Sequence, residues 1–379
     1  MRALCLAALM MLVAAIALPD SAFIALAGPR ATTKATNLPK AIFLALPHPG
    51  STAPVSAAPG VQLAQWNGSF TDLTNANVSY TMVGPSPATT NASTTVPVVI
   101  IPIKMVYGTL NGNRTFDPLA VTLPNGQSLM ANILGSPLFQ SNVTFVQGGT
   151  NVGTTQYIDA FQRANFWSSV SGNSLYHVLL GTPTVLPEQT IVVPLQDGMV
   201  EANPFGAGNV GTMYVNDFDS AVQGFISKLT QINPSVLPIF VTYDIYLSQL
   251  PLGQECCIGG YHSALGAQPS GQTYSYATYV DSPGAFSENV SALSHELGEW
   301  MDDPFVDNNV NCTDNSLMEV GDPLENNANY GTFPYAVNGF TYKLQSLVFL
   351  GYFGAPRSTS LNSWLSFQND EKSQCPGLP

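Results

Sequence analysis

One segment constrains the fold of this chain more than any other: residues 291–307, which read SALSHELGEWMDDPFVD. The surrounding pattern predicts a helix from about Ser287 to Asp303. Residues four apart share a face of a helix, so His295 and Glu299 present a nitrogen and an oxygen to one point. We expect this pair to bind a divalent cation, with Glu296 beside it as a base that polarises water.

The distribution of charge supports a cation at this point. Between Lys228 and Lys343 the chain has no Lys or Arg, yet 13 of its 24 acidic residues lie there. Carboxylates gathered without basic partners repel one another unless solvent screens them or a cation joins them. The alternative interpretation is a solvated acidic face on an amphipathic helix.

A third ligand is expected in the motif Met318-Glu319-Val320-Gly321-Asp322-Pro323. Glu319 follows Glu299 by 20 residues, a range over which a second helix or turn can swing back. We also expect Asp322 at the metal site, where it can hold the His295 ring by its other nitrogen. The alternative is that both acids only shape a turn around Gly321 and Pro323.

Asp302 and Asp303 are poor candidates for the same ion. On a continuous helix they lie about 10–12 Å along the axis from His295, and Pro304 bars the helix only just after them. We interpret the pair as a helix C-terminal cap or a second cation site.

His262 is the other histidine with a candidate catalytic role. It follows Cys256-Cys257-Ile-Gly-Gly-Tyr261. A disulfide from this loop to Cys312 would bring His262 near the metal, as a fourth ligand or as a proton donor to a developing oxyanion. A purely structural histidine is the alternative. Tyr330 and Tyr335 are weaker candidates for stabilising an oxyanion.

Composition excludes some classes of partner. Of 379 residues, 45% are hydrophobic and 9% are charged, and the formal net charge is −13. Eleven Lys and Arg are too few to neutralise a phosphate backbone, which argues against nucleic acid. They also argue against an anionic membrane surface. The uncharged polar surface that remains suits a secreted protein.

The N-terminus predicts export. Residues 1–27 contain Arg2, an apolar run from Leu4 to Leu18 and the small-residue sequence Ala25-Leu26-Ala27, the pattern of a cleaved signal peptide. The run is shorter than the ~20 residues of a membrane span. Residues 28–60, rich in Pro, Ala, Ser and Thr, predict a flexible or propeptide-like lead-in.

Four cysteines remain after the signal peptide: Cys256, Cys257, Cys312 and Cys375. An even number in an oxidising compartment predicts two disulfides. Because a bond between Cys256 and Cys257 closes a strained small ring, we expect each of them to pair with Cys312 or Cys375.

The rest of the chain predicts an α+β protein. Residues 61–149 form a β-rich region of short Val/Ile/Thr/Tyr runs, such as Val96–Ile103, separated by Asn-Gly turns. Residues 150–379 are expected to form the metal-binding domain. Further elements expected there are helices over Tyr157–Trp167 and Val215–Leu229 and strands over Leu237–Tyr246 and Tyr274–Val280.

The sequence SHELGEWMDDP followed by MEVGD resembles secreted, zincin-like proteins of bacteria and fungi, whose pattern is roughly HELAEAxTDP and then ExGD. HExxE is a variant of the HExxH zincin motif. Similar stretches at 155–167, 257–263 and 341–353 extend the resemblance over about residues 150–370. The chain departs from the pattern at Trp300-Met301-Asp302, where small residues and Thr are usual.

The resemblance implies a zincin-like catalytic domain with an active-site helix, preceded here by the β-rich region. It implies His295 and Glu299 as ligands, Glu296 as base and Glu319 as third ligand. We expect zinc, although oxygen ligands also admit calcium or manganese.

The leading hypothesis is a secreted endopeptidase that acts on polypeptides through a metal-bound water activated by Glu296. Two alternatives stay open. One is a non-catalytic extracellular binding protein with a zincin-like metal site. The other is a wall-sugar hydrolase using paired carboxylates such as Asp302, Asp303 and Glu319.

Overall fold

The structure is a computed structural model that describes residues 38–48, 51, 61–89, 92–109, 112–173, 175–312, 316–357, 361–376 and 378. The predicted signal peptide, residues 1–27, lies outside the described residues, as does most of the predicted lead-in. Within the described residues no helix is long and apolar enough to cross a membrane. Residues 38–379 belong to one compact unit.

This unit is α+β with a β-rich N-terminal region, as predicted, and most of its regular structure is β. Its strands are β1 Ile42–Leu46, β2 Gln65–Thr71, β3 Asn77–Val83, β4 Ser93–Val96, β5 Val98–Thr109, β6 Gly112–Phe116, β7 Val143–Gln147, β8 Thr150–Thr155, β9 His177–Leu180, β10 Thr184–Val185, β11 Gln189–Val193, β12 Gly198–Ala202, β13 Asn209–Tyr214, β14 Leu237–Tyr243, β15 Ile245–Ser248, β16 Cys256–Leu265, β17 Gln272–Tyr279, β18 Thr332–Val337 and β19 Phe340–Gln345. Its helices are α1 Leu129–Leu134, α2 Tyr157–Asn165, α3 Trp167–Val170, α4 Val215–Lys228, α5 Ser291–Asp302 and the 3₁₀ turns η1 Asp322–Leu324 and η2 Ala328–Gly331.

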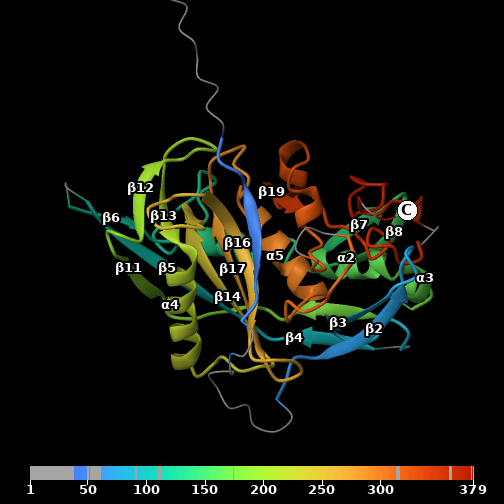
Figure 1. Cartoon of the computed structure of the whole chain (residues 1–379). Helices are drawn as coiled ribbons and strands as arrows, with labels where there is room; N and C mark the ends of the chain where they lie inside the picture. The colour runs from blue at the N-terminus through green and yellow to red at the C-terminus, as the bar shows by residue number, and fades with distance from the viewer. Residues whose placement is uncertain are drawn as a thin grey trace, which may run out of the picture. The chain divides into compact units, whose positions relative to one another are not determined.

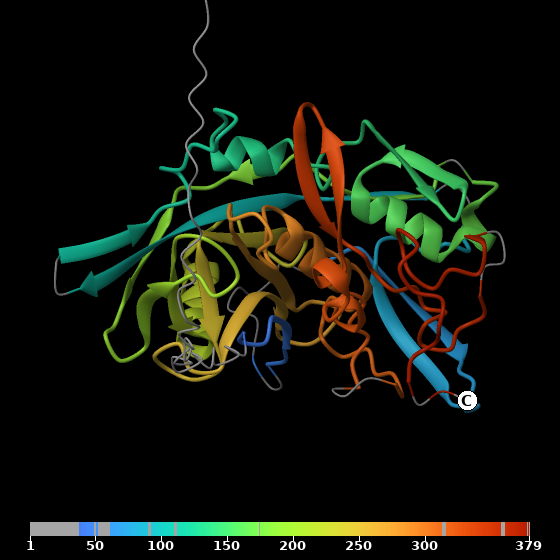
Figure 2. The same cartoon turned by 90° about the horizontal axis from the view of Figure 1, so that it is seen from above.

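The central sheet runs in the order β10-β5-β14-β17-β16-β15-β13-β12, with β1, β6 and β11 paired to its members. It is mixed: β5, β14 and β17 are parallel to one another, whereas β16 is antiparallel to β17. Toward one end of Figure 2 lies the β5–β6 hairpin, and toward the other lie α2 and the β7–β8 hairpin.

The two faces of this sheet carry separate apolar cores. Alternation along buried strands sends neighbouring side chains to opposite faces. Ile101, Ile103 and Phe240 pack with Phe218 and Val222 of α4. On the other face, Ile100, Ile239 and Val241 belong to the core that contains Leu297 and Trp300 of α5. Helices α4 and α5 therefore cover opposite faces (Figure 1).

Several predicted elements are confirmed. α4 matches the predicted helix, α5 begins a few residues later than expected, and β14 and β17 match the two predicted strands. The predicted strand at Leu237–Tyr246 is divided between β14 and β15 at Asp244, which has a positive φ of 52°. The regions predicted as 61–149 and 150–379 share one sheet, because β5 pairs with β14 over Leu237–Val241.

The prediction of a flexible lead-in is wrong for Ile42–Leu46. This short apolar run, IFLAL, forms β1 and pairs in parallel with β16, and Ile42 and Phe43 are buried. The surrounding composition of Pro, Ala, Ser and Thr concealed it, because five apolar residues show no sustained period. The exposed edge of β16 supplies the partner that makes it a strand.

The predicted disulfide pairing is wrong as well. Cys256 pairs with Cys257, and Cys312 pairs with Cys375 across 63 residues of sequence. The peptide bond between Cys256 and Cys257 is cis, and their Cα atoms lie 3.0 Å apart. Both pairs lie at disulfide distance, which points to an oxidising environment.

The two disulfides should differ in their effect on stability. Replacing Cys312 and Cys375 by Ala opens a loop of 63 residues and should lower the free energy of unfolding by about 2–4 kcal/mol, because the unfolded chain gains entropy. The matched Cys256→Ala/Cys257→Ala variant releases no such loop and should lose less. Urea denaturation of both variants measures the difference; equal losses would contradict this account.

A second constraint near this disulfide is the buried carboxylate of Asp72 at the β2–β3 turn. One oxygen accepts hydrogen bonds from Thr74 N (2.8 Å), Thr74 Oγ1 (2.7 Å) and Ala76 N (2.9 Å), and the other from Asn311 Nδ2 (3.0 Å). The hydrogen bonds from Asn311 and Thr74 lower the pKa of Asp72 to about 2, against the opposing effect of burial. Because hydrogen bonds favour the ionised form, they stabilise the folded state above the unfolded pKa of 3.8.

The contribution of Asp72 should therefore be present at neutral pH and be lost as the pH falls from about 4 to about 2. Asp72→Asn should lower the melting temperature at pH 7, and the gap to the wild type should narrow in acid. Thermal melts of both proteins at pH 7, 4 and 2.5 test this. A gap that does not change with pH would show that the charge of Asp72 contributes nothing.

Candidate metal centre

Helix α5 carries the HExxE motif through the interior of the protein. All 12 of its residues are buried, including His295, Glu296 and Glu299. Its apolar side chains pack into the core beneath the sheet, and Trp300 donates a hydrogen bond to Thr273 of β17 (3.0 Å). The motif therefore lies against the sheet and not on a solvated face, which excludes the alternative of an acidic surface helix.

Strand β16 brings His262 to the same place. Along this strand Tyr261 faces the α4 side, where its hydroxyl donates to Asp219 (2.9 Å), so His262 faces α5. Gly260, two residues earlier on the same face, makes room for Glu296: a Cβ at this position would lie 2.7 Å from Glu296 Cγ. A glycine inside a strand often marks such a close approach.

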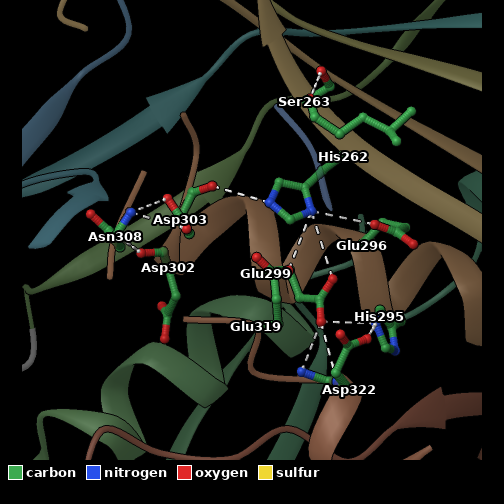
Figure 3. Close-up of polar contacts among 12 residues, drawn as sticks. His262, Ser263, His295, Glu296, Glu299, Asp302, Asp303, Asn308, Glu319 and Asp322 are labelled. Carbon is green, nitrogen blue, oxygen red and sulfur yellow. Dashed lines mark hydrogen bonds and ion pairs between the residues drawn. The ribbon is translucent and has the colours of Figure 1, made fainter. Parts of the chain in front are cut away.

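The loop after α5 supplies the remaining acids. Glu319 is buried, and the backbone amides of Gly321 and Asp322 donate to Glu299 Oε1 at 3.1 and 3.2 Å. Gly321 lies against the His295 ring, where a Cβ would come within 2.5 Å of the ring atoms. These contacts hold the loop that carries Glu319 and Asp322 against α5 (Figure 3).

The first group of possible ligands surrounds Nδ1 of His262. This nitrogen lies 3.5 Å from Glu296 Oε2, 3.6 Å from Glu299 Oε2 and 3.8 Å from Glu319 Oε2. The other ring nitrogen, Nε2, lies 3.1 Å from the backbone carbonyl of Asp303. Because that carbonyl can only accept, Nε2 carries the hydrogen, and Nδ1 presents a lone pair to the three carboxylates.

These atoms fit a bound divalent cation. His262 Nδ1, both oxygens of Glu296, both oxygens of Glu319 and Glu299 Oε2 are buried and have no hydrogen-bond partner. Buried polar atoms normally have a hydrogen-bond partner. A group of buried atoms without one therefore calls for another partner at this point, such as a cation. Ligands about 2.0–2.2 Å from a tetrahedral zinc lie about 3.3–3.6 Å apart, close to the separations seen around His262 Nδ1. His262, Glu296 and Glu299 lie close enough together to hold a metal ion, and Glu319 lies beside them.

The second group surrounds the other oxygen of Glu299. His295 Nε2 lies 2.9 Å from Glu299 Oε1 and 3.4 Å from Asp322 Oδ1. The three side chains are close enough to hold an ion. Both ring nitrogens of His295 and Asp322 Oδ1 also have no hydrogen-bond partner, but Glu299 Oε1 already accepts two backbone hydrogen bonds. The group around His262 contains more buried atoms without a partner and is therefore the better candidate.

The surroundings of the two histidines shift their pKa values in opposite directions. Burial lowers the pKa of His262 to about 4, so its ring is neutral at pH 7. Burial also opposes charge on His295, but the carboxylates of Glu299 and Asp322 outweigh it and raise its pKa well above the usual range. Burial and the charge of Glu299 raise the pKa of both Glu296 and Glu319 well above the usual range. The ionised forms of these carboxyls are thus disfavoured unless a cation lies close to them.

The structure brings together all six residues predicted for the site: His262, His295, Glu296, Glu299, Glu319 and Asp322. Their arrangement differs from the predicted one, because His295 and Glu319 lie on opposite sides of Glu299. His262 also reaches the site through the pairing of β16 with β17, not through a disulfide to Cys312.

Other candidates from the sequence have different roles. Asp303 is the C-cap residue of α5, and its carboxylate accepts hydrogen bonds from the amides of Asp307 (2.9 Å) and Asn308 (3.1 Å). Asp302 accepts hydrogen bonds from Gln162 and Asn165. The hydroxyl of Tyr335 donates to the Thr144 carbonyl (2.8 Å).

Two features of the site were missed from the sequence. Phe43 stacks on the His295 ring, and no motif marks it, because β1 was read as part of a flexible segment. Gly260 makes space for Glu296, and the Gly-Gly pair before Tyr261 was a usable signal for a close approach.

Comparison with known proteins adds no relative: the chain matches no family model, no curated protein and no solved structure. The resemblance to zincin-like proteins therefore remains a prediction from its motifs.

The geometry distinguishes the two histidines as ligands. Purified protein loaded with zinc should hold about one ion per chain, and His262→Ala should lose it. His295→Ala should retain most of it, because this ring pairs with Glu299 and is not needed for the group around His262. Plasma mass spectrometry after dialysis measures occupancy, with His177→Gln as the control at a histidine paired with Asp159. Loss of zinc in His295→Ala alone would favour the second group.

Proposed function

We propose that this chain is a secreted, zinc-dependent endopeptidase of the zincin-like type. The observation that supports the proposal is the buried group of three glutamates around the unprotonated Nδ1 of His262, on and beside a helix with the HExxE motif. One imidazole and carboxylate oxygens suit zinc, and they also admit manganese.

His262, Glu299 and Glu319 are the proposed ligands. The carbonyl of Asp303 orients the His262 ring, as backbone carbonyls do for metal-bound histidines. Two amide hydrogen bonds and the His295 contact hold Glu299 in place through Oε1, which leaves Oε2 directed at His262. A divalent cation held there supplies Lewis acidity that polarises a carbonyl or water oxygen.

Glu296 is the proposed general base. Its carboxylate touches the group around His262 through Oε2, and Oε1 has no hydrogen-bond partner. Burial raises its pKa well above the usual value, and neutral-pH base catalysis favours such a raised pKa. The environment therefore equips Glu296 to take a proton from water and pass it to the leaving amine.

Complete burial favours a second candidate, a non-catalytic protein that keeps the metal for stability or binding. His262, Glu296 and Glu299 each have no exposed surface, and a substrate cannot reach them unless something moves. The wall-sugar alternative has less support, because both carboxylates are already engaged: Asp302 accepts hydrogen bonds from side chains of α2, and Asp303 accepts from the amides that follow α5.

The Glu296→Gln variant separates the two candidates. In a zinc-loaded endopeptidase it should lower the hydrolysis of fluorescent casein at least about 100-fold, the usual scale of general-base loss. Zinc occupancy should persist, since His262, Glu299 and Glu319 remain. Glu201→Gln, on β12 away from the site, is the matched control.

The same measurements should be made in a Phe43→Ala background, which removes the ring that covers His295. The Phe43→Ala background tests whether the Phe43 ring keeps substrate away from the site in the wild-type protein. Zinc bound without any hydrolysis in either background would contradict the endopeptidase proposal and support the non-catalytic candidate.

A further inference from the structure

Strand β1 lies along the metal centre as an added edge strand. It pairs in parallel with β16 at Leu44–Tyr261, Ala45–His262 and Leu46–Ser263, so it runs beside the residue that carries the candidate ligand nitrogen. Figure 1 shows β1 in front of β16, between that strand and α5.

The edge that β1 occupies is the side of β16 that faces away from β17 and β15. Ile258 pairs with Leu247 of β15 and with Ile42 of β1, and Tyr261–Ser263 pair with β17 and with β1, so β1 lies opposite both of these strands. Without β1, this stretch of β16 would present unpaired backbone amides and carbonyls, which form a template for another extended chain.

Phe43 is the side chain that closes the site. Its ring stacks on His295 with centroids 3.8 Å apart and an interplanar angle of 25°, and it meets Phe286 edge-on at 5.5 Å. It is 4% exposed. Gly259 keeps this place free, since a Cβ there would lie 3.0 Å from the Phe43 ring and closer still to Phe286. An aromatic pocket is thus built beside the metal centre.

The other contacts of residues 40–46 combine main-chain bonds with side-chain packing. Cys257 N donates to the Lys40 carbonyl (3.0 Å), and Ser263 Oγ donates to the Leu46 carbonyl (2.6 Å). Ile42, Leu44 and Leu46 pack against the core that contains α4, and Lys40 forms an ion pair with Glu325 (3.5 Å). Main-chain pairing together with pockets for alternate side chains is how proteins recognise added peptide strands.

We infer that the edge of β16 and the pocket formed by His295 and Phe286 are a binding groove for an extended polypeptide with an aromatic side chain, which residues 40–46 fill. The inference deepens the proposed function and rests on it: the substrate class is an extended polypeptide, which enters the groove when β1 leaves. Phe43 is then a positioning residue that holds the site closed.

The test adds the peptide Lys-Ala-Ile-Phe-Leu-Ala-Leu, the sequence of residues 40–46 with a fluorescent label, to zinc-loaded protein. Phe43→Ala should bind it at least tenfold more tightly than the wild type, by fluorescence anisotropy, and should hydrolyse casein at least tenfold faster. The Phe43→Ala protein should bind the same peptide with Ala in place of Phe at least tenfold more weakly than it binds the original peptide. Phe70→Ala, an aromatic truncation on β2, should behave as the wild type.

Lys40→Ala is a second variant that leaves the core intact, because the Lys40 side chain is exposed and, among the described residues, its one ion pair is with Glu325. It should show a smaller increase in the same direction. Thermal melts check that both variants are folded.

The outcomes separate this inference from the function on which it rests. Peptide that binds according to its Phe but is never cleaved, with casein also intact, would support the groove and overturn the endopeptidase. Casein cleavage that is unaffected by Phe43→Ala, with no preferential peptide binding, would overturn the groove and leave the endopeptidase standing. Equal binding of both peptides would likewise overturn the aromatic pocket.

Discussion

The structure depends on one electrostatic constraint: several carboxylates lie buried together, and among the described residues no Lys or Arg forms an ion pair with Glu296, Glu299 or Glu319. Glu296, Glu299 and Glu319 lie against one histidine nitrogen and are out of contact with water. Removing such charges from water costs several kcal/mol each unless a partner compensates. His295 compensates Glu299, and a divalent cation at His262 is the compensation that the remaining atoms fit.

The central sheet fixes the position of the histidine that lies against these carboxylates. Strand β16 is held from both faces: Tyr261 reaches Asp219 on α4, and His262 reaches the carbonyl of Asp303 at the end of α5. That carbonyl belongs to the last turn of a helix, where acceptors lack helical partners. The carbonyl of Asp303 at the end of α5 therefore determines that Nε2 of His262 carries the hydrogen. The ring orientation is set before any ligand arrives.

The site is buried in part because β1, which pairs with β16, places the Phe43 ring over His295. The carboxylates need a low-dielectric pocket to hold a cation tightly, and Phe43 completes that pocket on the His295 side. The covering piece is a strand on an edge and not a core helix. In the proposed groove, opening the site requires the loss of the main-chain pairing of β1 and the exposure of Ile42 and Phe43.

Much of the secondary structure was predictable from local pattern. The spacing of apolar residues in Val215–Lys228 and the buried runs of β14 and β17 are strong signals, because each element repeats its period over most of its length. Five-residue β1 has no such signal, since its strand conformation comes from pairing with β16. The pairing of Cys312 with Cys375 was equally hidden, because residues 63 apart meet only through the folded chain.

The sequence by itself determined that a helix would present His295, Glu296 and Glu299 together, and that acids without basic partners would gather near them. Helical spacing and composition are local properties, so both follow without a fold. Only the tertiary structure decided that three glutamates gather around Nδ1 of His262, whereas His295 pairs with Glu299. The reason is physical: the role of each ring depends on which groups pack around it. The carbonyl of Asp303 and the ring of Phe43 come from distant parts of the chain.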